Sequence, residues 1–134
     1  MEEWKENKYV TSSLESKDSQ YAMFIGRWQP LHDGHKELFS QAFNKGKNVL
    51  ICIREGGIND KNPFTSEEVK QNITIQFQNE INDGKVKVII IPDICSVEFG
   101  RGVGYDIIEH IPPTKISNIS ATKVREKMRE EGKL

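Results

Sequence analysis

The sequence has few cysteines, no long apolar run and no excess of charge of either sign. Its two cysteines, Cys52 inside an apolar run and Cys95 in a later segment, lack the spacing of metal ligands, so we expect free, buried thiols in a reducing compartment. No apolar stretch approaches the ~20 residues of a membrane-spanning helix, and the polar N-terminus has no signal-peptide pattern. These absences predict a soluble, cytoplasmic protein.

The charges nearly cancel, because 19 Lys and Arg stand against 20 Asp and Glu. A balanced chain has no global field to hold nucleic acid or an anionic membrane, so we expect neither as a partner. Any phosphate must be bound locally. A length of 134 residues fits one domain around a single core.

Three nearly continuous apolar runs, at 21–25, 49–53 and 86–91, are rich in β-branched residues. Such runs are typical of strands that are covered on both faces, as in a parallel sheet. The polar residues 1–20 are expected to be a flexible or loosely docked arm that Trp4 and Tyr9 can attach to a surface. Residues 21–134 then form the single folded domain.

Helical patterns alternate with these strands. One helix is predicted from about Gly34 to Lys45, where Gly46 stops it. A second opens at Thr65 with a capping box to Glu68 and continues with apolar residues at steps of four. Right-handed crossovers make a doubly wound, Rossmann-like parallel sheet the natural α/β fold for this string.

The pattern after Ile91 is less regular. Residues 100–104 predict a glycine-rich loop, and Ile107 begins a brief helix that Pro112 and Pro113 end. A last short strand is predicted at 115–119, followed by a helix from Ser120 to about Glu131.

The turn after the first strand carries the most informative residues, His32-Asp33-Gly34-His35. A strand that leads through a glycine-containing turn into a helix offers backbone N–H groups and the helix dipole to an anion. Both imidazoles can face one bound group, and the missing side chain at Gly34 lets a ligand approach the backbone. This spacing suits a polyphosphate.

A second motif, Ile119-Ser120-Ala121-Thr122-Lys123-Val124-Arg125, lies near the C-terminus. Together with the first, it resembles the His-x-Gly-His and Ile-Ser-x-Thr-x-x-Arg motifs of the nucleotidyltransferase superfamily, which includes cytidylyltransferases and nucleotide adenylyltransferases. The resemblance covers about residues 21–130. It implies the strand order 3-2-1-4-5, with the nucleotide over the first strand.

The resemblance assigns roles to several residues. His32 and His35 would hold the phosphates and the transferring phosphorus, Ser120 and Thr122 would receive the β- and γ-phosphates, and Arg125 would neutralise pyrophosphate. Lys61 lies where the family often has a mobile phosphate-binding lysine. Ligands of such sheets bind beyond the carboxyl ends of the strands, which adds further candidate nucleotide-binding residues: Gly26, Arg27, Gly34, Arg54, Asp93 and Arg101. Lys45 and Lys47 precede a strand and are excluded.

The implied reaction is the transfer of a nucleotidyl group from a nucleoside triphosphate to a small phosphorylated acceptor, with release of pyrophosphate. A phosphate monoester is already largely ionised near neutral pH, since its second pKa is about 6, so no general base is required. Positioned donors and cations stabilise the charge on the five-coordinate phosphorus. We expect Mg²⁺ to be held mainly by phosphate oxygens and water, without a metal site built from side chains.

Each candidate also has a structural interpretation. Ser120 or Thr122 can be a helix N-cap, and Lys61 a solvated loop lysine. Arg54 and Arg101 suit surface ion pairs as well as phosphates. We expect Trp28 and Tyr105 to pack in the core, although both can stack on a substrate ring, and His110 to lie at the surface.

The substrates are less determined than the reaction. The segments 26–30 and 62–65 look like those of nicotinamide-nucleotide adenylyltransferases, which favours ATP over CTP. The chain is nevertheless close in size to the small cytidylyltransferases, so a CTP-dependent enzyme is the alternative. Many family members carry Glu-Arg where Glu68-Val69 stands here, which leaves the acceptor site open.

Two other classes of function stay open. A non-catalytic nucleotide sensor would use the same residues. A zinc site at His32, Asp33 and His35 would lack a fourth ligand. Whether the chain forms a homo-oligomer is also open.

Overall fold

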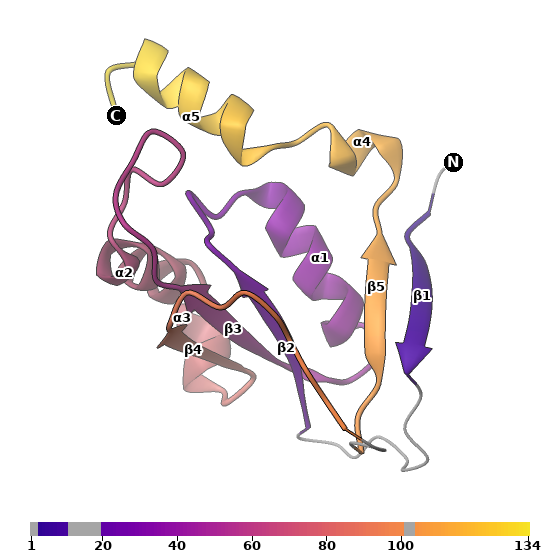
Figure 1. Ribbon diagram of the computed structural model, residues 1–134. Coiled ribbons are helices and arrows are strands. Elements are labelled where there is room, and N and C mark those ends of the chain that lie inside the picture. Colours follow the sequence, from indigo (N-terminus) through magenta and orange to yellow (C-terminus); the bar gives the residue numbers. More distant parts are fainter. Residues whose placement is uncertain (1–2, 11–19, 101–103) are drawn as a thin grey trace.

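The computed structural model describes residues 3–10, 20–100 and 104–134, and its centre is a three-stranded parallel sheet (Figure 1). The strands are β2 (Tyr21–Gly26), β3 (Asn48–Arg54) and β4 (Val86–Ile91), in the order β2-β3-β4. The three apolar runs are therefore confirmed as parallel strands. The register pairs Ile25 with Cys52 and Cys52 with Ile89, so all three strands end at one edge.

The helices α1 (Asp33–Phe43), α2 (Ser66–Gln76) and α3 (Gln78–Asn82) cover one face of this sheet (Figure 1). Both crossovers are connections between adjacent parallel strands and proceed in the same direction, so right-handedness places their helices on the same side. The largest fully buried side chains of the core come from this face of β3 and β4 and from the two longer helices: Val49, Ile51, Ile53, Val86, Phe39 and Ile73. The capping box between Thr65 and Glu68 is present as predicted.

The opposite face of the sheet is not covered by a helix in the described ranges, which corrects the doubly wound prediction. Several residues that alternate with the core positions stay partly exposed, with Met23 at 58% and Ile89 at 41%, whereas Cys52 at the centre is buried. The physical reason is the connection after β4, because residues 92–100 continue as non-helical chain. The sheet is therefore one-sided in the part of the chain that the structure describes.

Two further strands, β1 (Lys5–Val10) and β5 (Ile107–Ile111), form a separate antiparallel pair. The 3-2-1 part of the predicted order is present as β4-β3-β2, but positions 4 and 5 are not confirmed. The helix predicted from Ile107 is the strand β5, because β1 supplies a hydrogen-bonding partner that no local pattern reveals. In the same way, a segment of the N-terminal arm is a strand rather than a loosely docked chain.

His110 joins this antiparallel pair to the rest of the molecule. Its ring stacks on Phe24 of β2, with centroids 6.2 Å apart, and meets the edge of Trp4 at 6.5 Å. Only 12% of its side chain is exposed, so the expectation of a surface histidine was wrong. Burial lowers the pKa of His110, with Glu6 opposing that shift.

The C-terminal region contains α4 (Thr114–Ser117) and α5 (Ala121–Glu130). The strand predicted at 115–119 is wrong: Pro113 N-caps a short helical turn there. The last helix is confirmed, and Ser120 is its N-cap. In the described ranges, no helix has both the length and the apolar character needed to cross a membrane.

The core depends on Phe39, which is fully buried and makes edge contacts with the rings of Phe24, Trp28 and Phe77. We expect Phe39→Ala to lower the free energy of unfolding by about 3–5 kcal/mol, because the lost aromatic contacts leave a cavity. Urea unfolding measures this loss. Ile75→Ala, at a side chain that is 67% exposed, is the matched control and should cost less than about 1 kcal/mol. Equal losses in the two variants would contradict the assigned core.

Candidate functional site

The two histidines of the first turn cap helix α1. His32 is the N-cap, its Nδ1 accepts the N–H of Gly34 at 3.1 Å, and its own N–H donates to His35 Nδ1 at 3.1 Å. This is a capping box in which imidazole nitrogens replace the usual oxygens. A Cβ on Gly34 would lie 2.9 Å from His32 Cε1, so the glycine is needed because the imidazole folds back over it.

These hydrogen bonds fix the tautomer of both rings. Because each Nδ1 accepts an N–H, the proton of each neutral imidazole is on Nε2. The two rings are stacked, with centroids 3.6 Å apart and planes 17° from parallel. Burial lowers the pKa of His32, and burial together with His32 lowers the pKa of His35 to about 3. Near neutral pH, both histidines are therefore uncharged Nε2–H donors.

Trp28 supports His35 from the core. The indole meets the His35 ring edge-on with centroids 4.8 Å apart, is 7% exposed, and donates from Nε1 to the carbonyl of Cys52 at 3.0 Å. Its backbone has φ 52, and a Cβ on Gly26 would lie 2.9 Å from the indole. The expected core packing of Trp28 is confirmed. Tyr105, in contrast, is 49% exposed, so its expected burial was wrong.

Gln29 is a site residue that the sequence analysis missed. Its side-chain amide is 7% exposed and bonds both backbone groups of Phe64: Nε2 donates to the carbonyl, and Oε1 accepts the N–H, each at 3.0 Å. This pair fastens the 55–65 loop to the first turn. A polar residue between Trp28 and a proline was the only available signal, and its partner lies 35 residues away.

Arg125 reaches the same point from helix α5. Its Nη1 donates to the carbonyl of Gln29 at 2.8 Å and its Nη2 to Thr122 Oγ1 at 3.3 Å. The residue is only 7% exposed. The predicted phosphate ligand is therefore also a buried tie between α5 and the first turn.

The start of α5 lies beside the start of α1. A Cβ on Gly34 would be 3.5 Å from Ile119 Cβ, and Ser120 Oγ accepts the N–H of Lys123 at 3.1 Å. The N-cap interpretation of Ser120 is confirmed, and it does not conflict with anion binding, since both use the same helix end. Two helix N-termini thus meet at the carboxyl edge of the sheet.

A second basic group lies at the ends of β2, β3 and β4. Asp93 accepts from Arg27 Nη2 at 3.1 Å and from Arg54 Nη2 at 2.9 Å. Arg54 also donates to the carbonyl of Ile94 at 2.8 Å. A Cβ on Gly56 would lie 2.1 Å from Arg27 Nη1, so this glycine leaves room for the guanidinium. The structure therefore brings these three predicted residues together.

Two predicted site residues remain, Lys61 and Arg101. Lys61 is exposed on the 55–65 loop, where Asn59 Oδ1 accepts its N–H, and Asp60 of the same loop accepts from Arg129 of α5. Arg101 lies outside the described residues. Cys52 is buried as expected, but Cys95 is exposed, so its predicted burial was wrong.

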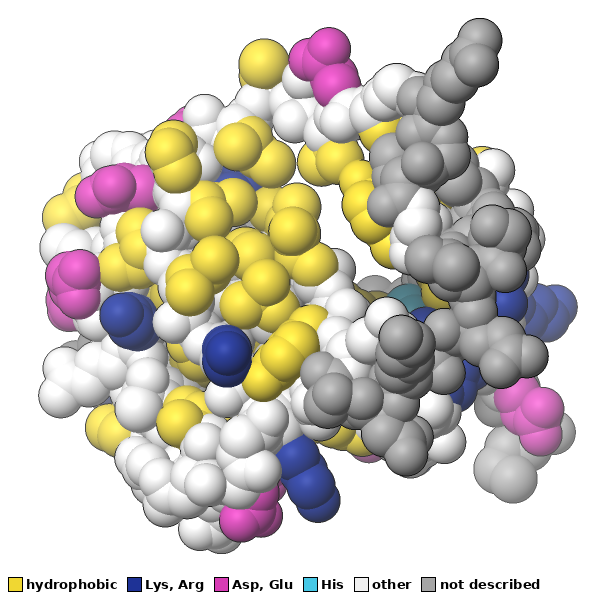
Figure 2. Space-filling view, turned by 90° about the horizontal axis from the view of Figure 1, so that it is seen from below, with side chains coloured by type: hydrophobic (Ala, Val, Ile, Leu, Met, Phe, Trp, Pro, Cys, Tyr) yellow, Lys and Arg dark blue, Asp and Glu magenta, His cyan; other side chains and the backbone are white. Residues whose placement is uncertain are grey.

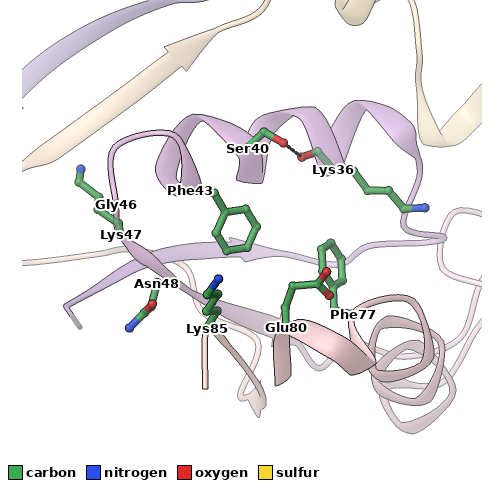
Figure 3. Close-up of a pocket in the computed structure, with 9 residues that line it drawn as sticks. All are labelled: Lys36, Ser40, Phe43, Gly46, Lys47, Asn48, Phe77, Glu80 and Lys85. Atoms are coloured by element: carbon green, nitrogen blue, oxygen red, sulfur yellow. Dashed lines mark hydrogen bonds between the residues drawn. The ribbon is translucent and has the colours of Figure 1, made fainter. Parts of the chain in front are cut away.

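A groove of about 470 Å³ lies on the flank of α1 toward the amino edge of the sheet (Figure 3). Phe43 and Phe77 form its apolar part, and Lys47 and Lys85 lie on its border. This groove is separate from the histidine turn. Lys45, one of the two lysines excluded from the site, pairs with Glu6 of β1. A different groove, of about 480 Å³, borders the candidate site between α2 and α5, where Trp28, Phe64 and Met128 contribute to its lining.

Comparison with known proteins gives a family match and several similar adenylyltransferases. Residues 23–83 match the cytidylyltransferase-like family. A nicotinamide-nucleotide adenylyltransferase of Thermococcus sibiricus is 35% identical over 75 residues, which are 54% of this chain and 40% of that protein. The corresponding enzyme of Methanococcus aeolicus is 30% identical over 114 residues, or 83% of this chain and 63% of that protein.

A solved bifunctional NMN adenylyltransferase/ADP ribose pyrophosphatase from Francisella tularensis shares 36% identity over 55% of this chain and 22% of its own, with a TM-score of 0.46. The chain spans about 40% of the length of several of the curated relatives it matches. The family match begins in β2 and contains the whole histidine turn, α1, β3 and α2. The family match and these relatives together support membership of the nucleotidyltransferase superfamily.

Proposed function

We propose that this protein transfers AMP from ATP to a small molecule that bears a phosphate monoester, and releases pyrophosphate. The observation that carries the proposal is the meeting of two capped helix N-termini, α1 and α5, next to two neutral Nε2–H donors. Such a place stabilises several phosphate oxygens at once. Relatives named nicotinamide-nucleotide adenylyltransferase support adenylyl transfer and make a nicotinamide mononucleotide the first acceptor to test.

In the proposed reaction, an oxygen of the acceptor phosphate attacks the α-phosphorus of ATP. A new P–O bond forms while the bond from the α-phosphorus to the bridging oxygen breaks, and that oxygen leaves with pyrophosphate. The acceptor is already ionised, so no residue has to remove a proton. Catalysis then depends on holding two anions in line and on stabilising charge in the transition state.

The residues divide this work by charge. His32 and His35 donate hydrogen bonds without adding charge, because burial keeps both rings neutral. The N-terminus of α5, with Ser120 and Thr122, would receive the β- and γ-phosphates. Arg125 supplies a fixed positive charge beside them, since the carbonyl of Gln29 holds its guanidinium.

The loop residues would complete the phosphate site. Lys61 lies on the loop that Gln29 fastens to the histidine turn, and its flexible side chain would bring an ammonium to the polyphosphate. Arg27 and Arg54 would approach the acceptor phosphate, with Asp93 orienting both guanidinium groups. Gly26 and Gly34 would keep the backbone accessible.

Magnesium fits this site as a companion of the substrate. In the described ranges, no group of three or more His, Cys, Asp and Glu side chains is arranged to hold a metal ion. Mg²⁺ keeps part of its hydration shell and binds phosphate oxygens readily, so it would enter with the triphosphate and lower the repulsion between the two anions. The protein would orient the complex through its N–H donors and Arg125.

The direct test is pyrophosphate release with a panel of phosphate monoesters and each nucleoside triphosphate. We expect turnover with ATP and a mononucleotide acceptor. Turnover with CTP alone would replace the adenylyl by a cytidylyl transfer. Binding of ATP without turnover on any acceptor would contradict the proposed enzyme and leave a nucleotide sensor.

The Nε2–H donor of His35 can be separated from the helix cap. His35→Asn retains an acceptor near the position of Nδ1, so the cap is kept while the Nε2 donor is lost. We expect kcat to fall about 100- to 1,000-fold, the usual effect of removing one such donor, with little change in the melting temperature. Activity above a tenth of the wild-type value in a folded variant would contradict the donor role.

The depressed histidine pKa values predict how stability depends on pH. Burial holds the pKa of His35 in the folded protein at about 3, below the usual histidine value of 6.5. Below pH 6.5, the unfolded chain therefore binds a proton at this histidine that the folded protein does not bind. Stability should therefore fall as the pH drops from about 6.5 toward 5, before the carboxylates titrate. Urea unfolding across this range measures it. His35→Asn should reduce the slope, while His32 and His110, whose pKa values are also lowered, retain part of it. An unchanged slope would contradict the burial of a neutral His35.

The role of Arg125 is tested with Arg125→Lys, since the Ala variant would also leave the buried carbonyl of Gln29 without a donor. One ammonium can keep the bond to Gln29 but cannot serve a phosphate at the same time. We expect ATP binding to weaken about tenfold and AMP binding to change little. Calorimetric titration gives both constants, and Lys127→Arg, at an exposed position of the same helix, is the control. Equal losses for ATP and AMP would contradict contact with the outer phosphates.

A further inference from the structure

The 55–65 loop is held by hydrogen bonds from two other segments of the chain. At its C-terminal end, the buried side-chain amide of Gln29 bonds both backbone groups of Phe64, each at 3.0 Å. In its middle, Arg129 of α5 donates from Nη2 to the carbonyl of Asp60 at 2.7 Å. The first contact fastens the loop to the histidine turn, whereas the second joins it to the last helix.

The tip of the loop is a compact turn that fixes the backbone of Lys61. Asn59 Oδ1 accepts the N–H groups of Lys61 and Asn62, each at 2.9 Å. The backbone groups of Asn59 and Asn62 also bond each other, at 3.0 and 3.1 Å. A side chain that accepts from the backbone two residues on makes an Asx turn. Asp60 lies inside this turn, directly before Lys61, so a bond to its carbonyl holds the turn as a unit.

The exposed part of the loop has little packing of its own. Residues 57–61 are all exposed, and even the apolar side chain of Ile58 is 64% exposed. A Cβ on Gly57 would meet no atom within 4 Å. Segments with few buried contacts open locally at low cost in free energy. The position of the turn therefore depends on the bond from Arg129 to Asp60.

Helix α5 connects this contact to the nucleotide site. Arg125 and Arg129 are four residues apart and lie on one side of the helix, about 6 Å from each other along its axis. Arg125 Nη1 donates to the carbonyl of Gln29 at 2.8 Å, so neighbouring arginines of α5 hold both the histidine turn and the loop. In the proposed function, the N-terminus of the same helix receives the outer phosphates of ATP.

Figure 1 shows the 55–65 loop next to the C-terminal half of α5, which agrees with the bond from Arg129. Figure 2 views the molecule from below, on the side away from α5, and shows hydrophobic side chains gathered in one broad area there. The contact between the loop and α5 is made away from this apolar area, at the end of the sheet where β3 leads into the loop and β2 into the histidine turn.

We propose that Arg129 is a positioning residue, which holds the loop so that the ammonium of Lys61 meets the outer phosphates of ATP. The inference rests on the proposed function, because it takes the triphosphate as the ligand of Lys61. Arg129 acts through the backbone of Asp60 and does not itself contact the substrate. When the bond is absent, Lys61 keeps its charge but is spread over several loop positions, so less of its interaction with the phosphates is realised.

A double-mutant cycle, with ATP binding measured by calorimetric titration, tests the proposal. Arg129→Met removes the donor to Asp60 and should weaken ATP binding about fivefold, the equivalent of one ordinary hydrogen bond. Lys61→Met removes the ammonium and should weaken it about tenfold. The double variant should bind ATP no more weakly than Lys61→Met, because the loop position has no effect without the ammonium. Losses that multiply in the double variant would show that Arg129 acts directly on the ligand and would overturn the proposal.

Two further variants separate the backbone bond from charge pairing. Arg129→Lys keeps the positive charge and one donor group, so it should recover part of the ATP affinity that Arg129→Met loses. Asp60→Asn removes the carboxylate and leaves the carbonyl in place, so it should keep the wild-type affinity within about twofold. A loss in Asp60→Asn equal to that in Arg129→Met would assign the contact to charge pairing and contradict the proposal.

Amide hydrogen exchange reports the position of the loop without any ligand. Peptides that cover residues 57–63 should exchange about fivefold faster in Arg129→Met than in the wild type, while those of α2 should not change. Circular dichroism confirms that the variant is folded. Unchanged exchange in the loop would overturn the positioning role.

Pyrophosphate release separates this proposal from the proposed function. ATP binding without turnover on any acceptor would contradict the proposed reaction alone, because ATP affinity still measures the cycle of Arg129 and Lys61. Turnover in the wild type, together with independent losses in the cycle, would contradict only the role of Arg129. A wild type that binds no ATP would overturn both.

Discussion

The buried contact between Arg125 and Gln29 holds the site together. One guanidinium from the last helix donates to the backbone of the first turn, and the side chain of the same glutamine bonds both backbone groups of Phe64. Three segments that are far apart in the sequence meet at this residue. A buried charge without such partners would cost several kcal/mol, so the contact specifies where α5 must lie.

The histidine turn follows a related logic. Imidazole nitrogens satisfy the first N–H groups of α1, and this use of Nδ1 fixes the proton on Nε2. Capping and ligand binding therefore employ opposite nitrogens of the same rings. Burial against Trp28 holds His35 neutral, so the turn offers directed hydrogen bonds, while the positive charge of the site comes from arginine and lysine side chains nearby.

The two faces of the parallel sheet differ in the described ranges. The covered face and its helices form the core and place the first turn at the carboxyl edge. The other face keeps the apolar pattern of a buried surface without a helical layer in the described ranges.

Much of this protein was determined by local sequence. The apolar runs of β2, β3 and β4, the capping box at Thr65, the cap at Ser120 and the His-Gly-His turn depend on neighbours within a few residues, so their patterns identify them. What only the tertiary structure decided are contacts between distant segments. The pairing of β1 with β5, the burial of His110 and the amide clamp of Gln29 depend on partners 35 to more than 100 residues away, and local periodicity carries no information about such partners.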